Sequence, residues 1–187
     1  MRNPLAAFRK FDLFWILACP LYLVLGIIRH EGSHVLAAVG EGATITEFNF
    51  IPSVRPDGGF VWGYVLVDGD VSWLTGAAPY FCDLLTFLAV FPLCHFVVFK
   101  RRWVWLNLVI LGILSPLVNS LNNYFIGYTR GGDVGYLRQV IGSIAVDAYF
   151  SATIGAYLIG LFVVLCYSKS ATLGSPSQTQ QRDTKQM

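Results

Sequence analysis

Residues 25–38 have the sequence LGIIRHEGSHVLAA and place a His30-Glu31-x-x-His34 motif inside an otherwise apolar segment. On a helix, side chains four residues apart share a face, so His30 and His34 can bind one zinc ion from adjacent turns. Glu31 lies one step round the helix, where its carboxylate can reach a water molecule on that metal. Ionisable groups in a lipid-embedded helix are costly and usually functional. The stretch predicts a metal site; the alternative is a pair of histidines that only hydrogen-bond inside a helix bundle.

The composition around this motif is that of an integral membrane protein. The chain has 187 residues, of which 55% are hydrophobic and 13% are charged, whereas soluble domains carry about 25% charged residues. The net charge of +2, without a basic stripe, excludes a nucleic-acid partner. The four cysteines have no CxxC spacing and are expected to be small buried hydrophobic residues. We therefore expect an all-α membrane protein surrounded by lipid.

Four apolar segments are each long enough to cross a hydrocarbon core of about 30 Å. They cover about residues 12–39, 71–99, 103–128 and 148–167, and together predict about four transmembrane helices in a single domain, 1–167. Residues 168–187 are rich in Ser, Thr and Gln and are predicted to form a disordered polar tail.

A different pattern separates the first two spans. Residues 44–50 and 60–67 are rich in β-branched and aromatic side chains, and the sequence PDGG at 56–59 is typical of a turn. A small β-hairpin or sheet is therefore predicted within about residues 43–70, at the membrane surface. Asp57 is assigned to the turn of this hairpin and not to a metal site.

The distribution of basic residues predicts the orientation in the membrane. Nine of the thirteen lie before the first span, between the second and third, or after the fourth: Arg2, Arg9, Lys10, Lys100, Arg101, Arg102, Lys169, Arg182 and Lys185. The positive-inside rule then places both termini in the cytoplasm. We expect a plasma-membrane protein, of bacterial type, with the β segment and the far end of the first span on the opposite side.

A catalytic zinc site needs a third protein ligand and an open position. Asp133 follows Gly131 and Gly132 after the third span, on the side predicted for the two histidines. Asp83, an intramembrane carboxylate in the second span, is the alternative metal ligand. The sequence favours Asp133 and leaves Asp83 open.

Three asparagines gather near the end of the third span, where lipid offers amides no partner. They are Asn119, Asn122 and Asn123. They are predicted to bind the substrate backbone or the oxygen that develops charge in the transition state; the alternative is hydrogen bonding between helices.

The run HEGSHVLAA at residues 30–38, the β segment that follows it, the glycine- and proline-containing residues 76–79 and the Asn-rich span that ends in Gly-Gly-Asp resemble a known family. It is the site-2 protease family of intramembrane zinc metallopeptidases, peptidase family M50, and the likeness is closest to its M50B-like branch. It covers about residues 26–141. The resemblance implies one Zn²⁺ per chain, held by His30, His34 and Asp133, with Glu31 as general base. Where the family often has an asparagine after its Gly-Pro element, this chain has Asp83.

The sequence thus predicts a zinc metalloprotease that hydrolyses peptide bonds in or near membrane-spanning segments of its substrates. Its expected partners are membrane lipid, a transmembrane or membrane-anchored protein substrate, and an accessory membrane protein or a second copy of the chain. The main alternative is an inactive scaffold, a pseudoprotease that binds transmembrane helices without cutting them. A small ion transporter is a third alternative, which the lack of an internal repeat disfavours.

Overall fold

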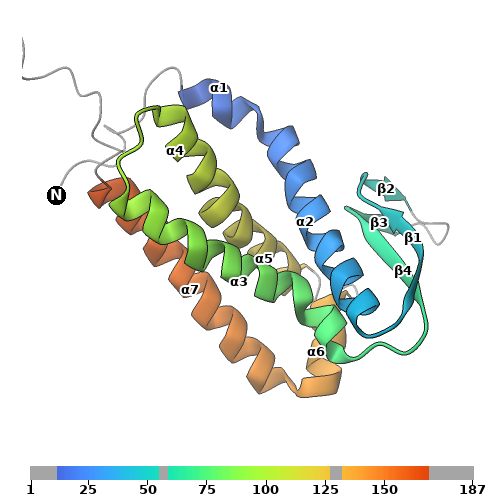
Figure 1. The fold of residues 1–187 in the computed structure, drawn as a ribbon. Coiled ribbons are helices and arrows are strands. Elements are labelled where there is room, and N and C mark those ends of the chain that lie inside the picture. Colours follow the sequence, from blue (N-terminus) through green and yellow to red (C-terminus); the bar gives the residue numbers. More distant parts are fainter. Residues whose placement is uncertain (1–11, 55–58, 127–131, 169–187) are drawn as a thin grey trace, which may run out of the picture.

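The computed structural model describes residues 12–54, 59–126 and 132–168, and these residues are mostly helical (Figure 1). The helices are α1 (Asp12–Leu17), α2 (Cys19–Gly40), α3 (Trp73–Phe96), α4 (Arg102–Val109), the π-helical turn η2 (Ile110–Leu114), α5 (Ser115–Phe125), α6 (Asp133–Ile141) and α7 (Ser143–Tyr167). The strands are β1 (Thr44–Asn49), β2 (Ser53–Val54), β3 (Phe60–Val61) and β4 (Tyr64–Asp68). Most of the predicted turn at 56–59 and nearly all of the predicted tail at 168–187 lie outside the described residues.

Three helices of the described residues are long and apolar enough to cross a membrane, as expected of an integral membrane protein. They are α3, the continuous helix Arg102–Phe125 formed by α4, η2 and α5, and α7. The 22-residue helix α2 is about 33 Å long. It carries Arg29, His30, Glu31 and His34 close together, and these side chains make it less apolar than the other three.

One predicted span is divided into two helices, and one predicted span boundary was wrong. The first span is interrupted at Ala18, and α2 starts anew with Pro20 in its first turn, where the missing N–H of proline costs no helical hydrogen bond. The last helix, α7, begins at Ser143 and not near 148, so it includes the charged residue Asp147. Asp147 is tolerated there because Arg138 of α6 forms an ion pair with it and Tyr124 of α5 donates a hydrogen bond to it.

The long helices form a bundle with two buried apolar clusters. The larger cluster lies between α3, the helix Arg102–Phe125 and α7, and consists of Phe87, Cys94, Trp105, Leu106, Val109, Ile113, Leu117, Tyr157 and Val164. The smaller cluster joins α3, α6 and α7, and consists of Ala77, Tyr80, Val134, Leu137, Val146 and Phe150. Many other large apolar side chains are exposed, including Leu85 and Leu88 on α3 and Ile159 and Phe162 on α7. Such side chains on membrane helices can contact lipid.

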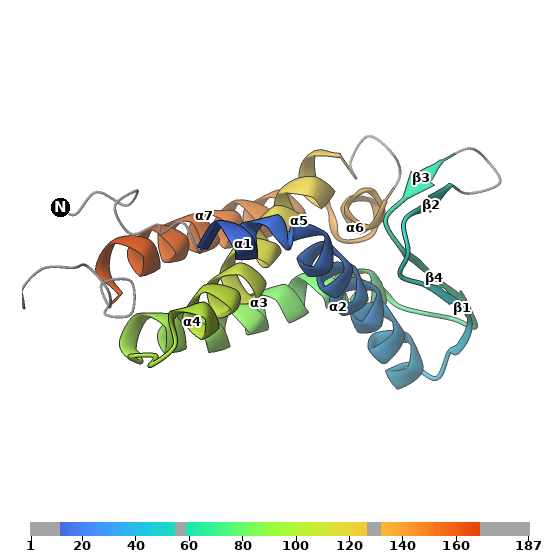
Figure 2. The ribbon, with the colours of Figure 1, turned by 90° about the horizontal axis from the view of Figure 1, so that it is seen from above.

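The β segment, predicted as a small hairpin or sheet, forms two nested antiparallel pairs. β1 pairs with β4, and β2 pairs with β3 inside them. The predicted strand at 60–67 is interrupted at Trp62 and Gly63. A Cβ on Gly63 would lie 2.7 Å from Ile27 Cγ2 and 2.8 Å from Glu31 Cγ. The chain therefore passes directly against α2 at this point, and the strands stand beside the end of the bundle (Figure 2).

The elements divide between the two ends of the bundle. α1, the loop between α3 and α4, and the last turn of α7 lie at one end, and the strands and α6 lie at the other (Figure 1). At the second end Glu41, just after α2, accepts hydrogen bonds from the backbone N–H of Ser72 at 2.5 Å and from its hydroxyl at 2.6 Å. These bonds hold the pKa of Glu41 below its usual value. Since Ser72 caps α3, the contact fixes the end of α2 beside the start of α3.

The contact between α3 and η2 depends on a glycine, which gives a test of the bundle. A Cβ on Gly112 would lie 2.4 to 2.7 Å from three atoms of Val90. We expect Gly112→Ala to lower the free energy of unfolding by about 1–3 kcal/mol, because the helices must separate or distort. The measurement is unfolding of the detergent-solubilised protein by a strong denaturing detergent. Gly155→Ala, whose Cβ would meet nothing within 4 Å, is the control; equal effects at the two positions would contradict this packing.

Candidate metal centre

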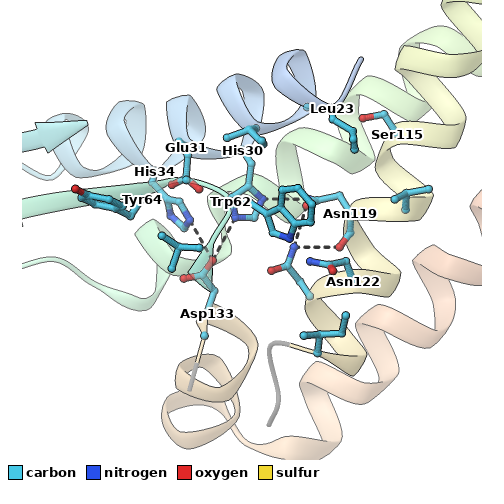
Figure 3. A pocket seen from close by; sticks show the side chains of 18 of the residues that line it. Leu23, His30, Glu31, His34, Trp62, Tyr64, Ser115, Asn119, Asn122 and Asp133 are labelled. Atoms are coloured by element: carbon cyan, nitrogen blue, oxygen red, sulfur yellow. Dashed lines mark hydrogen bonds and ion pairs between the residues drawn. The ribbon is translucent and has the colours of Figure 1, made fainter. Parts of the chain in front are cut away.

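His30, His34 and Asp133 lie together although about one hundred residues separate the aspartate from the histidines. The histidines project from adjacent turns of α2, and Asp133 is the first residue of α6 (Figure 3). The Asp133 Oδ2 atom lies 3.3 Å from His30 Nε2 and 3.2 Å from His34 Nε2. One ligand atom from each of the three residues lies within 4.8 Å of the other two, so the group could hold a metal ion.

The hydrogen bond on the far side of His34 bears directly on metal binding. His34 Nδ1 lies 2.8 Å from the backbone carbonyl oxygen of Thr75 on α3. A carbonyl oxygen only accepts, so Nδ1 must donate, and the lone pair of a neutral ring is on Nε2. This lone pair then faces an oxygen of Asp133 at 3.2 Å, and two such acceptors need a proton or a metal ion between them. Metal-binding histidines generally have this arrangement, in which the second nitrogen donates to a carbonyl or carboxylate.

Asp133 is brought to the histidines by the packing of α6. Val134 and Leu137 of this short helix are buried against α3 and α7. Burial raises the pKa of Asp133, but the contacts with His30 and His34 outweigh it and hold that pKa well below its usual value. The aspartate is therefore an anion, and its place in the first turn of α6 suits a negative charge.

Glu31 lies in the same cavity wall without belonging to the three-residue group. Its side chain is 7% exposed, and it stands on α2 between the two histidines (Figure 3). The cavity has a volume of about 1380 Å³. It is lined by α2, by the helix Arg102–Phe125 and by residues 59–65 of the β segment, including Trp62 and Tyr64. A carboxylate beside a possible metal site, in a cavity of this size, is suitably placed for proton transfer.

The three predicted asparagines all line this cavity. Asn119 is the one in contact with the histidines, since its Nδ2 lies 3.1 Å from His30 Nδ1. Asn123 donates hydrogen bonds to the side-chain and backbone oxygens of Asn119, at 2.9 and 3.0 Å. Asn119 and Asn123 thus bond to each other within α5, and the bond between helices that the alternative expected is the one from Asn119 to Asp83 of α3. Asn122 also lines the cavity.

The structure does not bring Asp83 into the metal group. Its carboxylate is 2.7 Å from the Arg29 guanidinium and accepts a hydrogen bond of 2.7 Å from Asn119. The sequence reading gave Arg29 no role. The sequence could have indicated this ion pair, because a lone arginine and a lone aspartate in two predicted membrane helices each need a partner.

Comparisons of the chain with protein-family models, with curated proteins and with solved structures found no match. The account of the site therefore depends on its geometry and on the sequence motif.

The grouping of His30, His34 and Asp133 predicts the zinc content of the purified protein. We expect about one zinc per chain in the detergent-purified protein, and loss of most of it in Asp133→Ala, because a zinc site needs three protein ligands. Atomic spectroscopy of protein dialysed against trace zinc measures this ratio. Glu31→Gln and the exposed-site variant Asp70→Asn are the controls and should keep their zinc. Zinc retained in Asp133→Ala would assign the third ligand to another residue.

Proposed function

We propose that the chain is an intramembrane zinc metalloprotease that hydrolyses peptide bonds in or beside membrane-spanning segments of other proteins. The observation that carries this proposal is the meeting of His30, His34 and Asp133 beside Glu31, in a large cavity at one end of an apolar helix bundle. The site-2 protease resemblance assigns the same four residues to zinc and to the general base. A cofactor of one Zn²⁺ per chain follows from this proposal.

His30, His34 and Asp133 would hold the ion, and His34 is already oriented by its bond to Thr75. Bound zinc supplies a Lewis acid that polarises the scissile carbonyl and lowers the pKa of water toward about 7. Glu31 takes a proton from the attacking water and delivers it to the nitrogen of the leaving amine. Asn122 at the cavity wall would offer an N–H donor to the substrate backbone or to the oxygen of the carbonyl under attack, whereas the amide N–H groups of Asn119 and Asn123 already bond within the protein.

We also propose how the chain is oriented in the membrane. We propose that α2 is a fourth membrane span beside the three apolar helices, since its polar side chains face the bundle and the cavity. Lys100, Arg101 and Arg102 belong to the end opposite the strands, and the positive-inside rule assigns that end to the cytoplasm of a bacterial plasma membrane. The cavity then opens near the other surface, where a substrate helix can unwind before cleavage.

The β segment is proposed to hold the unwound substrate. Residues 59–65 line the cavity opposite α2, and β4 pairs with β1 on only one of its edges in the described residues. An extended peptide can add to the free edge of such a strand through backbone hydrogen bonds. The substrate bond would then lie in the cavity that this strand, Glu31 and the two histidines line.

Proteolysis can be tested with the purified chain in liposomes. Suitable substrates are single-span model proteins whose transmembrane helix contains glycine and asparagine, compared with an all-leucine helix. We expect zinc-dependent cleavage of the former only, and a fall of about 10²- to 10⁴-fold in Glu31→Gln, which has lost its base. Gly155→Ala should cleave as the wild type does. Binding of the substrate helix without cleavage, unchanged in Glu31→Gln, would support the inactive scaffold instead.

Strand addition is tested by proline, which removes a backbone donor from the strand. Val65→Pro is expected to reduce cleavage of the same substrates by at least about tenfold, with its zinc content unchanged. Zinc content reports that α2 and α6 remain in place. Full cleavage by a zinc-loaded Val65→Pro protein would exclude the strand as the substrate holder.

A further inference from the structure

We infer that the cavity also holds the part of the substrate that stays helical, in an apolar groove that runs from the metal group along α2 toward the other end of the bundle. The occupant would be a single transmembrane helix of another protein, with its unwound segment at the histidines. This inference deepens the proposed function and rests on its substrate class.

The cavity extends well beyond the metal group. Along α2 it is lined from His34 back to Cys19, the first residue of that helix, which is about 22 Å along the helix axis. This length is most of a hydrocarbon core of about 30 Å. The volume of about 1380 Å³ also exceeds the range of about 300–1000 Å³ that is usual for small-molecule sites. A membrane-spanning segment has the dimensions that this space requires.

The long part of the cavity is apolar on each of the helices that line it. We define the apolar groove by six residues at spacings of one helical turn or on the neighbouring helix: Leu23 and Ile27 of α2, Ile110, Leu114 and Val118 of the helix Arg102–Phe125, and Leu161 of α7. Leu23, Leu114 and Val118 are exposed, so their side chains are accessible to an occupant of the groove.

Polar side chains on this part of α2 are bonded within the protein. The Tyr22 hydroxyl donates a 2.7 Å hydrogen bond to Asn107 Oδ1, and the Arg29 guanidinium contacts Asp83 at 2.7 Å. Such a groove suits a helix, whose backbone groups are bonded internally. At the metal end the lining changes to Glu31, the histidines and Asn122, where an unwound backbone can find partners. The polarity of the cavity thus changes along its length as the proposed substrate changes from helix to extended chain.

The β segment favours a peptide over a lipid chain as the occupant. Tyr64 and Val65 of β4 both line the cavity, although neighbouring residues of a strand point to opposite faces. The cavity therefore borders the edge of the strand, where backbone donors and acceptors lie in a row. A peptide can pair with this row, whereas an acyl chain cannot.

Photocrosslinking tests where the substrate helix lies. Benzoylphenylalanine is placed at Leu23 or Val118 in the groove, or at the exposed Leu85 or Ile159 outside it, in Glu31→Gln protein with the single-span substrate in liposomes. We expect crosslinks to the substrate from the two groove positions and not from the two controls. Because Leu23 lies two turns from His30, its crosslinks should fall about seven residues farther from the unwound segment than those of Val118.

Filling the groove tests whether cleavage depends on it. We expect Leu114→Trp to lower kcat/KM for the same substrate about 10- to 200-fold, since added bulk in an apolar site excludes a ligand by this factor. Leu85→Trp, on the outer face of α3, should cleave as the wild type does. Zinc content equal to that of the wild type shows that the metal end of Leu114→Trp is folded. If it is not, the crosslinking result decides.

The outcomes separate this inference from the proposed function. Substrate crosslinks confined to the groove positions, without cleavage by the wild type, would support the groove and overturn the protease. Cleavage by the wild type with groove probes that crosslink only lipid, or no better than the controls, would overturn the groove alone. Neither cleavage nor groove crosslinks would overturn both.

Discussion

Lipid provides no partner for a charge or a free hydrogen-bonding group, and this constraint governs how the helices of this chain pack. Arg29 on α2 and Asp83 on α3 would each be costly alone in an apolar bundle, and together they form an ion pair of 2.7 Å. The same arginine reaches the carbonyl of Leu111 in the π-helical turn. The pair therefore joins three helices at one level, one residue away from the first histidine of the motif.

The metal group is completed by elements that the motif itself does not contain. Thr75 lies in the first turn of α3, which Ser72 and Glu41 hold beside the end of α2. Asp133 begins α6, whose buried face packs on α3 and α7. Both contacts lie at the end of the bundle where the strands stand, so a ligand could enter from the membrane surface without crossing the packed core.

The β segment is part of the same cavity and not a separate appendage. Gly63 allows the chain to pass within contact distance of Ile27 and Glu31, where any side chain would overlap them. Residues 59–65 consequently form the wall that faces the histidines. Substrate binding through this strand and proton transfer by Glu31 would then take place in one cavity. A displacement of the strand would alter the surroundings of the carboxylate.

The sequence alone determined the features that depend on local geometry. The spacing of His30 and His34 places them on one helical face whatever the rest of the fold does, and the apolar runs indicated the membrane helices. It could not fix the division of the β segment at Gly63 or the early start of α7, since each depends on a contact with a residue elsewhere in the chain. The tertiary structure also decides whether Asp133 or Asp83 joins the two histidines in the candidate metal group. Both are carboxylates in segments that the sequence made suitable. The packing of α6 places Asp133 beside the histidines, whereas Asp83 pairs with Arg29 and stays out of the group.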